Sequence, residues 1–215
     1  MSERSLTLEC AAVKSQAATQ PPSAAPTKRA TAMAPQERRA AIVEAVRPLL
    51  VEHGEAITTK QIATAAGIAE GTIFRVFADK DELLDAVLDA TVDQAPLEAA
   101  LRGIDRSRSF EDQLLEATVL LQKRVVDVWT LLSHLSAKRH EQVRGPMTDS
   151  PELAKLFAAH PGRIRTEPAT AARYLRALTM SLTHPLIAAE AASATDIVDL
   201  VLHGVGRTQA GEGMA

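Results

Sequence analysis

Residues 58–87, TTKQIATAAGIAEGTIFRVFADKDELLDAV, decide the fold of this chain. Thr58 and Gln61 have the spacing of a capping box and predict the start of a short helix. Gly67 predicts its end, because glycine readily adopts the left-handed conformation found just past a helix C-terminus. A second short helix is expected over about residues 69–77. Two short helices joined by a glycine-containing turn are typical of a helix-turn-helix motif.

Helical patterns continue on both sides of this motif. A first helix is expected to begin at Pro35 and to end before Gly54. Asp79 has the chemistry of the N-cap of a fourth helix, which is expected to run to about Ala95. Further helices are expected from Ser109 through Leu132, over 151–159, from Pro168 to Leu186 with a kink at Pro185, and from Thr195 to Gly204. No strand-like alternation occurs, so the predicted fold class is all-α.

The composition excludes several classes of protein. No apolar run reaches the roughly 18 residues of a membrane span and no signal-peptide pattern is present, so we expect a soluble, cytoplasmic protein with no membrane partner. The single Cys10 cannot form an intrachain disulfide. No nucleophile, phosphate-loop or metal-ligand motif occurs, so we expect no catalytic residues, no metal and no cofactor. The net charge of −3 gives no overall basic signature, and DNA binding has to be argued from local geometry.

The stretch over residues 58–87 resembles the DNA-binding signature of the TetR family of bacterial transcriptional regulators, and the resemblance covers about residues 36–92. It implies an N-terminal three-helix head that binds double-stranded operator DNA, and a C-terminal helical body that binds a small-molecule effector and forms a homodimer. It also implies that the effector releases the protein from DNA. The expected organisation is a disordered tail over 1–34, the head over 35–80, the body over 81–206 and a flexible tail over 207–215.

The same resemblance, taken position by position, implies which side chains meet DNA. Thr59 matches a phosphate contact, Lys60 a position that can reach bases, and Lys80 a phosphate-binding lysine at a helix start. An ammonium beside the free N–H groups of a helix N-terminus does favour an anion. The expected groove-facing positions of the recognition helix are Glu70, Gly71, Thr72 and Arg75, and Phe74 is expected at a further position on the DNA side.

The head also departs from the family pattern. Ala69 replaces the usual Ser, so the recognition helix lacks a side-chain cap, at a cost of about 1 kcal/mol. Phe74 and Val76 replace the commoner Tyr and His and remove two polar groups. Residues 35–90 hold six Lys and Arg against ten Asp and Glu. An alternative therefore stays open, in which the helix-turn-helix has lost DNA binding and serves as a protein-interaction module.

The body offers two further sets of candidates. The first is a pair of apolar helix stripes, expected either to form the dimer interface or to pack internally: Leu175, Leu178, Leu182, Leu186, Val198, Val201 and Leu202. The second is a set of residues that either line an effector pocket or belong to the core: Trp129, His134, Met147, Phe157, Met180 and His184. With so few aromatic residues, such a pocket is expected to favour an apolar effector. An enzyme that uses this pocket is disfavoured, since no nucleophile or paired carboxylates accompany it.

Overall fold

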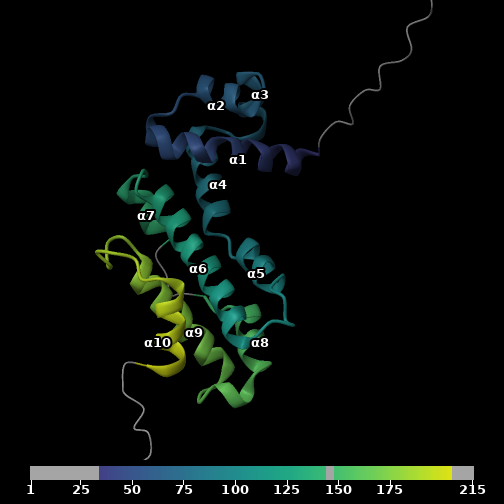
Figure 1. The fold of residues 1–215 in the computed structure, drawn as a ribbon. Coiled ribbons are helices and arrows are strands. Elements are labelled where there is room, and N and C mark those ends of the chain that lie inside the picture. Colours follow the sequence, from purple (N-terminus) through teal and green to yellow (C-terminus); the bar gives the residue numbers. More distant parts are fainter. Residues whose placement is uncertain (1–33, 144–147, 205–215) are drawn as a thin grey trace, which may run out of the picture. The chain divides into compact units, whose positions relative to one another are not determined.

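The computed structural model describes residues 34–143 and 148–204, and every regular element in these ranges is a helix (Figure 1). The all-α prediction is therefore confirmed for the described residues. The first elements are α1 (Pro35–His53), the short 3-10 turn η1 (Gly54–Ala56), α2 (Thr59–Ala66), α3 (Glu70–Val76) and α4 (Lys80–Val92). They are followed by α5 (Ala95–Arg102), α6 (Phe110–Leu132), α7 (Ala137–Gln142), α8 (Pro151–Ala158), η2 (Pro161–Arg163), α9 (Pro168–Thr183) and α10 (Ala194–His203).

The helix ends of the motif follow from local chemistry. The Thr58 hydroxyl accepts the backbone N–H of Gln61, and the Gln61 side chain accepts the backbone N–H of Thr58 at 2.9 Å, which confirms the capping box. Gly67 closes α2 with φ 64° and ψ 32°, the predicted left-handed conformation. Ala69 precedes α3 without a side-chain hydrogen bond, as its methyl group requires. Asp79 caps α4 by accepting the N–H of Glu82 at 2.8 Å.

Two predicted helix ends were wrong, and proline explains both. Helix α4 ends at Val92 rather than near Ala95, because Pro96 has no N–H to continue the helix and instead occupies the first turn of a separate helix, α5. Helix α9 ends at Thr183, so Pro185 does not kink it. The residue before a proline is pushed out of the helical conformation, and His184 has the extended ψ of 123°.

Buried side chains form two clusters. The first joins α1 to α4 and includes Leu131 and Leu135 from the end of α6 and the turn after it. The second joins α5, the first half of α6, α8, α9 and α10. Helix α4 contributes its buried leucines and valine to the first cluster, so it shares a core with the helix-turn-helix that precedes it.

Two parts of the predicted organisation lie outside the described residues, namely the tail over 1–34 apart from Ala34 and the tail over 207–215. In the described part of the chain, no helix combines the length and the apolarity that a bilayer crossing requires.

Candidate nucleic-acid interface and effector cavity

The recognition helix is anchored by one face and open on the other. Helix α3 packs on α2 and α1 (Figure 1). Ile73 and Phe77 are each only 1% exposed, which confirms the prediction that they face inward. Phe74 is 49% exposed, and Glu70, Gly71 and Arg75 are exposed beside it, with Thr72 half-buried. The residues that the resemblance assigns to the groove are thus on the solvent face of α3.

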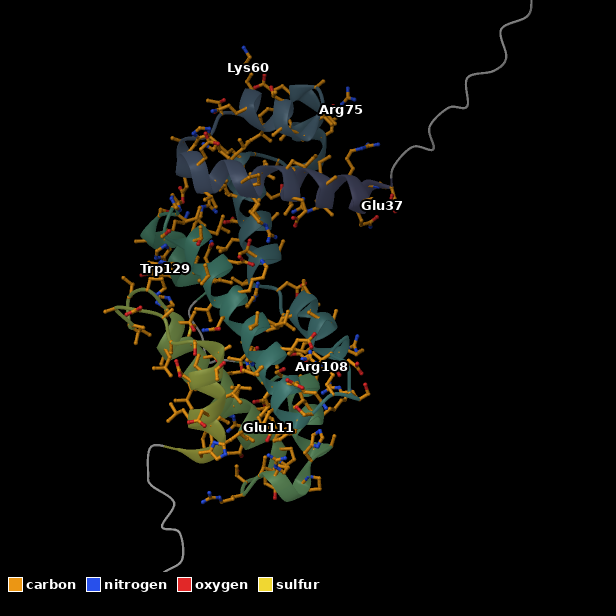
Figure 2. The ribbon with its side chains drawn as sticks, viewed as in Figure 1. Glu37, Lys60, Arg75, Arg108, Glu111 and Trp129 are labelled. Atoms are coloured by element: carbon orange, nitrogen blue, oxygen red, sulfur yellow. The ribbon has the colours of Figure 1, made fainter. Side chains whose placement is uncertain are left out.

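Two cations extend from this part of the head. Figure 2 shows Lys60 on α2 and Arg75 on α3 pointing away from α1 into solvent. Neither side chain has a hydrogen-bond or ion-pair partner within residues 34–143 and 148–204. Both charges are therefore available to an external anion.

Thr59 and Glu70 contact each other. The Thr59 hydroxyl donates a hydrogen bond to the Glu70 carboxylate and so joins the first residue of α2 to the first residue of α3. Sequence reasoning treated these two positions as independent DNA contacts. Because a hydroxyl has one proton to donate, the Thr59 side chain can donate to a phosphate only if this bond to Glu70 opens.

Lys80 is also engaged within the head. Its Nζ donates a hydrogen bond to the carbonyl oxygen of Glu55, at 2.5 Å. An ammonium has three N–H donors, so two remain for another acceptor. The lysine lies half-buried at the first position of α4, where the helix N-terminus also favours an anion.

Arg39 connects the end of α3 to the start of α4. Its guanidinium lies 4.3 Å from the ring centroid of Phe77 and donates to the Val76 carbonyl at 3.2 Å and to the Glu82 carboxylate at 2.9 Å. The N–H of Ala78 bonds the same carboxylate, and this bond, followed by the bond from Arg39, lowers the pKa of Glu82. Arg39 therefore holds the junction between α3 and α4 and sets the direction in which α3 points.

A cavity of about 400 Å³ opens in the body, between α5, α6 and α9. Of the predicted pocket residues, Trp129, Met180 and His184 line it. The rings of Trp129 and His184 pack with centroids 4.7 Å apart. The remaining lining is mostly aliphatic, and sequence reasoning had not named it: Val92, Leu97, Leu121, Val125, Val128, Leu132 and Val143.

The other predicted pocket residues do not line this cavity. Phe157 is fully buried in the second core cluster and packs edge-on against Phe110, because α8 turns its apolar face inward. His134 is exposed beyond the end of α6, and its Nδ1 hydrogen-bonds the Thr130 carbonyl. Met147 lies outside the described residues.

Sequence reasoning missed two arginines in the cavity wall. Arg124 on α6 and Arg176 on α9 both line the cavity, and Arg176 is only 8% exposed. A signal for them was present, because each arginine occupies an apolar position of its helix. Arg124 follows Leu121 by three residues and precedes Val128 by four, which is the spacing of the buried stripe.

The predicted dimer-interface residues are divided between core and surface. Leu175 and Val198 are buried within their own chain at 0% and 5% exposure, where they contribute to the second core cluster. Leu186 lies beyond the end of α9 and is 75% exposed. The other candidates are half-buried: Leu178, Leu182, Val201 and Leu202.

Comparisons with known proteins agree with this architecture. Residues 42–87, which hold the helix-turn-helix, match the sequence profile of "Bacterial regulatory proteins, tetR family". The HTH-type transcriptional repressor Rv3405c of Mycobacterium tuberculosis and the HTH-type transcriptional regulator Mb3439c of Mycobacterium bovis are each 34% identical to the chain over 137 residues. The matched part is 58% of this chain and 68% of each relative.

Two solved structures share the fold. A protein from Mesorhizobium loti assigned to the TetR family superposes with a TM-score of 0.56 at 18% identity, covering 80% of this chain and 95% of the other. A regulator of the TetR/AcrR family from Thermobifida fusca superposes with a TM-score of 0.52 at 23% identity, covering 79% and 99%. The motif and the matched relatives define a helix-turn-helix transcriptional regulator. The chain belongs to the TetR family.

Proposed function

We propose that this regulator is a homodimeric repressor that is released from a pseudo-palindromic operator when a small, mainly apolar molecule binds in the body. The observation that carries the proposal is the two-sided recognition helix, with Ile73 and Phe77 buried and Gly71, Phe74 and Arg75 exposed. The relative from M. tuberculosis is named a repressor, which supports repression rather than activation.

In this proposal the exposed face of α3 enters the major groove. Arg75 reads base edges, Gly71 lets the backbone approach the DNA, and Phe74 packs against it. Lys60 reaches the duplex from α2, while the phosphate backbone is held by Thr72, by Lys80 and by Thr59, whose hydroxyl has to leave Glu70 before it can donate to a phosphate. Two copies of α3 meet half-sites about 10 base pairs apart or a multiple of that spacing.

The surface of the body supports dimer formation. Large apolar side chains are exposed on α9 and just beyond it: Tyr174 at 57%, Leu186 at 75% and Ile187 at 63%. A second hollow, of about 530 Å³, lies between α9 and α10 and is lined by Tyr174, Leu178 and Val201. A twofold partner that packs α9 and α10 against their copies would cover this surface.

The proposed DNA face predicts the effect of removing its two free cations. Arg75→Ala is expected to lower operator affinity by about 1–3 kcal/mol and to relax sequence preference, because it deletes a base contact. Lys60→Ala is expected to weaken binding as well. Fluorescence anisotropy with DNA from upstream of the protein's own gene measures both, with Lys123→Ala, an exposed cation on α6, as the control that keeps parental affinity.

Parental DNA affinity in both head variants would contradict docking through α3. It would favour the alternative that the net-acidic head is a protein-interaction module. If Lys123→Ala lost as much affinity as Arg75→Ala, DNA binding would depend only on the total charge of the protein and not on specific contacts by Lys60 and Arg75.

Gly71 allows a second test, in which stability and DNA binding change in opposite directions. A Cβ placed at Gly71 meets no other atom within 4 Å, so Ala fits without a clash. Alanine also favours the helix, and we expect Gly71→Ala to stabilise the fold by up to about 1 kcal/mol. Operator affinity is expected to fall by at least tenfold, because the methyl group intrudes where the backbone meets DNA. Thermal unfolding and anisotropy on the same sample measure both, and unchanged affinity would place Gly71 away from the DNA.

A further inference from the structure

Two arginines in the wall of the cavity in the body form no ion pair with the described residues. Arg124 and Arg176 project into its wall from facing helices, α6 and α9, which pack against each other. Neither guanidinium has a carboxylate within 4 Å among residues 34–143 and 148–204. An arginine stays protonated even when it is buried, so both remain charged.

Backbone carbonyls are the only hydrogen-bond acceptors that these guanidiniums have in the described chain. Arg124 donates to the carbonyls of Thr91 and Asp93, the latter at 2.9 Å, and Arg176 donates to the carbonyl of Thr148. A guanidinium carries five N–H donors, so each arginine keeps several for another partner. Carbonyl groups solvate a cation but do not neutralise it, and an unpaired charge in an apolar setting is costly.

Burial makes both charges costly. It is the main cause that lowers the pKa of Arg124, while Asp93 and Asp127 act in the opposite direction and the positive charges of Arg47 and then Arg176 lower the pKa further. Burial likewise lowers the pKa of Arg176, against the attraction of Glu98 and Asp149. An anion beside these guanidiniums would offset the desolvation of both charges.

The rest of the cavity has a different character. Its wall is aliphatic apart from Trp129 and His184 at one side and the neutral polar groups of Gln94, Thr148 and Thr179. A volume of about 400 Å³ is within the range of sites for small organic molecules. The cavity thus combines an apolar wall with two cationic side chains.

We propose that the ligand of this cavity is a small amphipathic organic acid, whose carboxylate lies between Arg124 and Arg176 and whose apolar part packs against the aliphatic wall and Trp129. The inference rests on the proposed function only in naming this ligand as the effector. A guanidinium matches a carboxylate with two parallel hydrogen bonds, which a neutral ligand cannot offer.

Arg124 connects this site to the head. The carbonyls that it bonds, those of Thr91 and Asp93, are at the C-terminal end of α4 and just beyond it. The N-terminal end of α4 carries Lys80 and shares the core of the helix-turn-helix. A carboxylate that binds the remaining N–H donors of Arg124 pulls on the guanidinium that holds these carbonyls, and so changes the contact by which α6 holds α4.

The fluorescence of Trp129 provides a direct test, because it is the only tryptophan of the chain and lines the cavity. The probes are aliphatic and aromatic monocarboxylic acids of six to twelve carbons (roughly the size range the cavity admits), each paired with its primary amide. We expect at least one acid to change the emission of Trp129 and to bind at least tenfold more tightly than its amide. Amides that bind as tightly as their acids, or no response to any acid at millimolar concentration, would overturn the inference.

Two variants and two matched controls test whether Arg124 and Arg176 cause the preference for acid over amide. Arg176→Met and Arg124→Met keep the length of the side chain and are expected to remove the preference for acid over amide. Arg173→Met on α9 and Lys123→Met on α6 remove neighbouring exposed cations that do not line the cavity, and the preference should persist in both. Arg176→Lys, checked by circular dichroism, keeps the charge and should retain part of the preference even where Arg176→Met fails to fold.

The same acids, added to the complex of the protein with DNA, separate this inference from the proposed function. An acid that binds at Trp129 without releasing DNA supports the anion site and contradicts ligand-controlled repression. Release of DNA by neutral apolar compounds, with no acid binding at Trp129, supports ligand control and overturns the anion site.

Discussion

Arg139→Met is expected to lower the free energy of unfolding by about 3 kcal/mol, because Arg139 balances three carboxylates at once. Its side chain is only 6% exposed and pairs with Glu55 at 3.3 Å, Asp81 at 2.8 Å and Asp85. This expected loss is at the low end of the range for a broken buried ion pair, because Asp81 and Asp85 are 76% and 43% exposed and can be rehydrated. Urea denaturation of the full chain measures the change, and Lys138→Met, an exposed neighbour on α7, should leave stability within about 0.5 kcal/mol of the parent.

This network joins parts of the chain that are far apart in sequence. Glu55 follows α1, Asp81 and Asp85 are on α4, and Arg139 is on α7. Glu55 also accepts the backbone N–H of Ser136, at 2.7 Å. Arg139 therefore stabilises the contact of the helix-turn-helix head with the segment that follows α6.

The pH dependence provides an independent check on Arg139. Burial raises the pKa of Glu55, but the hydrogen bonds from Ser136 and the charge of Arg139 outweigh it, so the folded pKa is below the ordinary 4.5. A carboxyl group with a lowered folded pKa stabilises the fold above its unfolded pKa, and this stabilisation is lost as the pH falls through the folded value. The gap in stability between parent and Arg139→Met should therefore narrow below about pH 4.5. A gap that stayed constant down to pH 3 would show that packing, and not charge, explains the loss.

Phe77→Ala is expected to cost about 3–5 kcal/mol of stability, the largest effect among the head variants. The ring is 1% exposed, belongs to the core formed by α1 to α4, and supports the guanidinium of Arg39. Its removal leaves a cavity beneath the end of α3 and releases the cation that holds the α3–α4 junction. Chemical denaturation followed by circular dichroism measures the loss.

Phe74→Ala is the matched control for Phe77→Ala, because it deletes the same kind of side chain three residues earlier, within α3, whereas Phe77 directly follows this helix. Phe74 is 49% exposed, so its removal should change stability by less than about 0.5 kcal/mol. The DNA affinity should fall in this variant, since Phe74 is on the proposed groove face. Equal destabilisation by the two substitutions would contradict the two-sided description of α3.

Much of the head could be predicted from sequence, because its signals act over three or four residues. The Thr58–Gln61 capping box, the left-handed Gly67 and the Asp79 cap each involve neighbouring backbone groups. Ile73 and Phe77 are four residues apart, about one helical turn, and this spacing likewise predicts that both face inward. Such features do not depend on the rest of the chain.

The ends of the longer helices were predicted less well. The predicted α4 extended beyond Val92 because the helical pattern continued, although Pro96 cannot continue a helix. The apolar stripe of α9 was likewise extended through Pro185 because its periodicity continued. Local backbone chemistry overruled an apolar pattern at both sites. The partition of α9 and α10 into core and surface was also not predictable, since Leu175 and Leu178 have the same hydrophobicity but different neighbours.

The sequence by itself determined the fold class, the helix-turn-helix and the face that α3 turns outward, because short-range hydrogen bonds and helical periodicity specify them. Only the tertiary structure decided which charges meet. It paired Lys80 with the Glu55 carbonyl, gathered three carboxylates around Arg139, and placed Arg124 and Arg176 in one cavity. These partners are separated by 25 to 84 positions along the chain, and their distances depend on how whole helices pack, which no local pattern records.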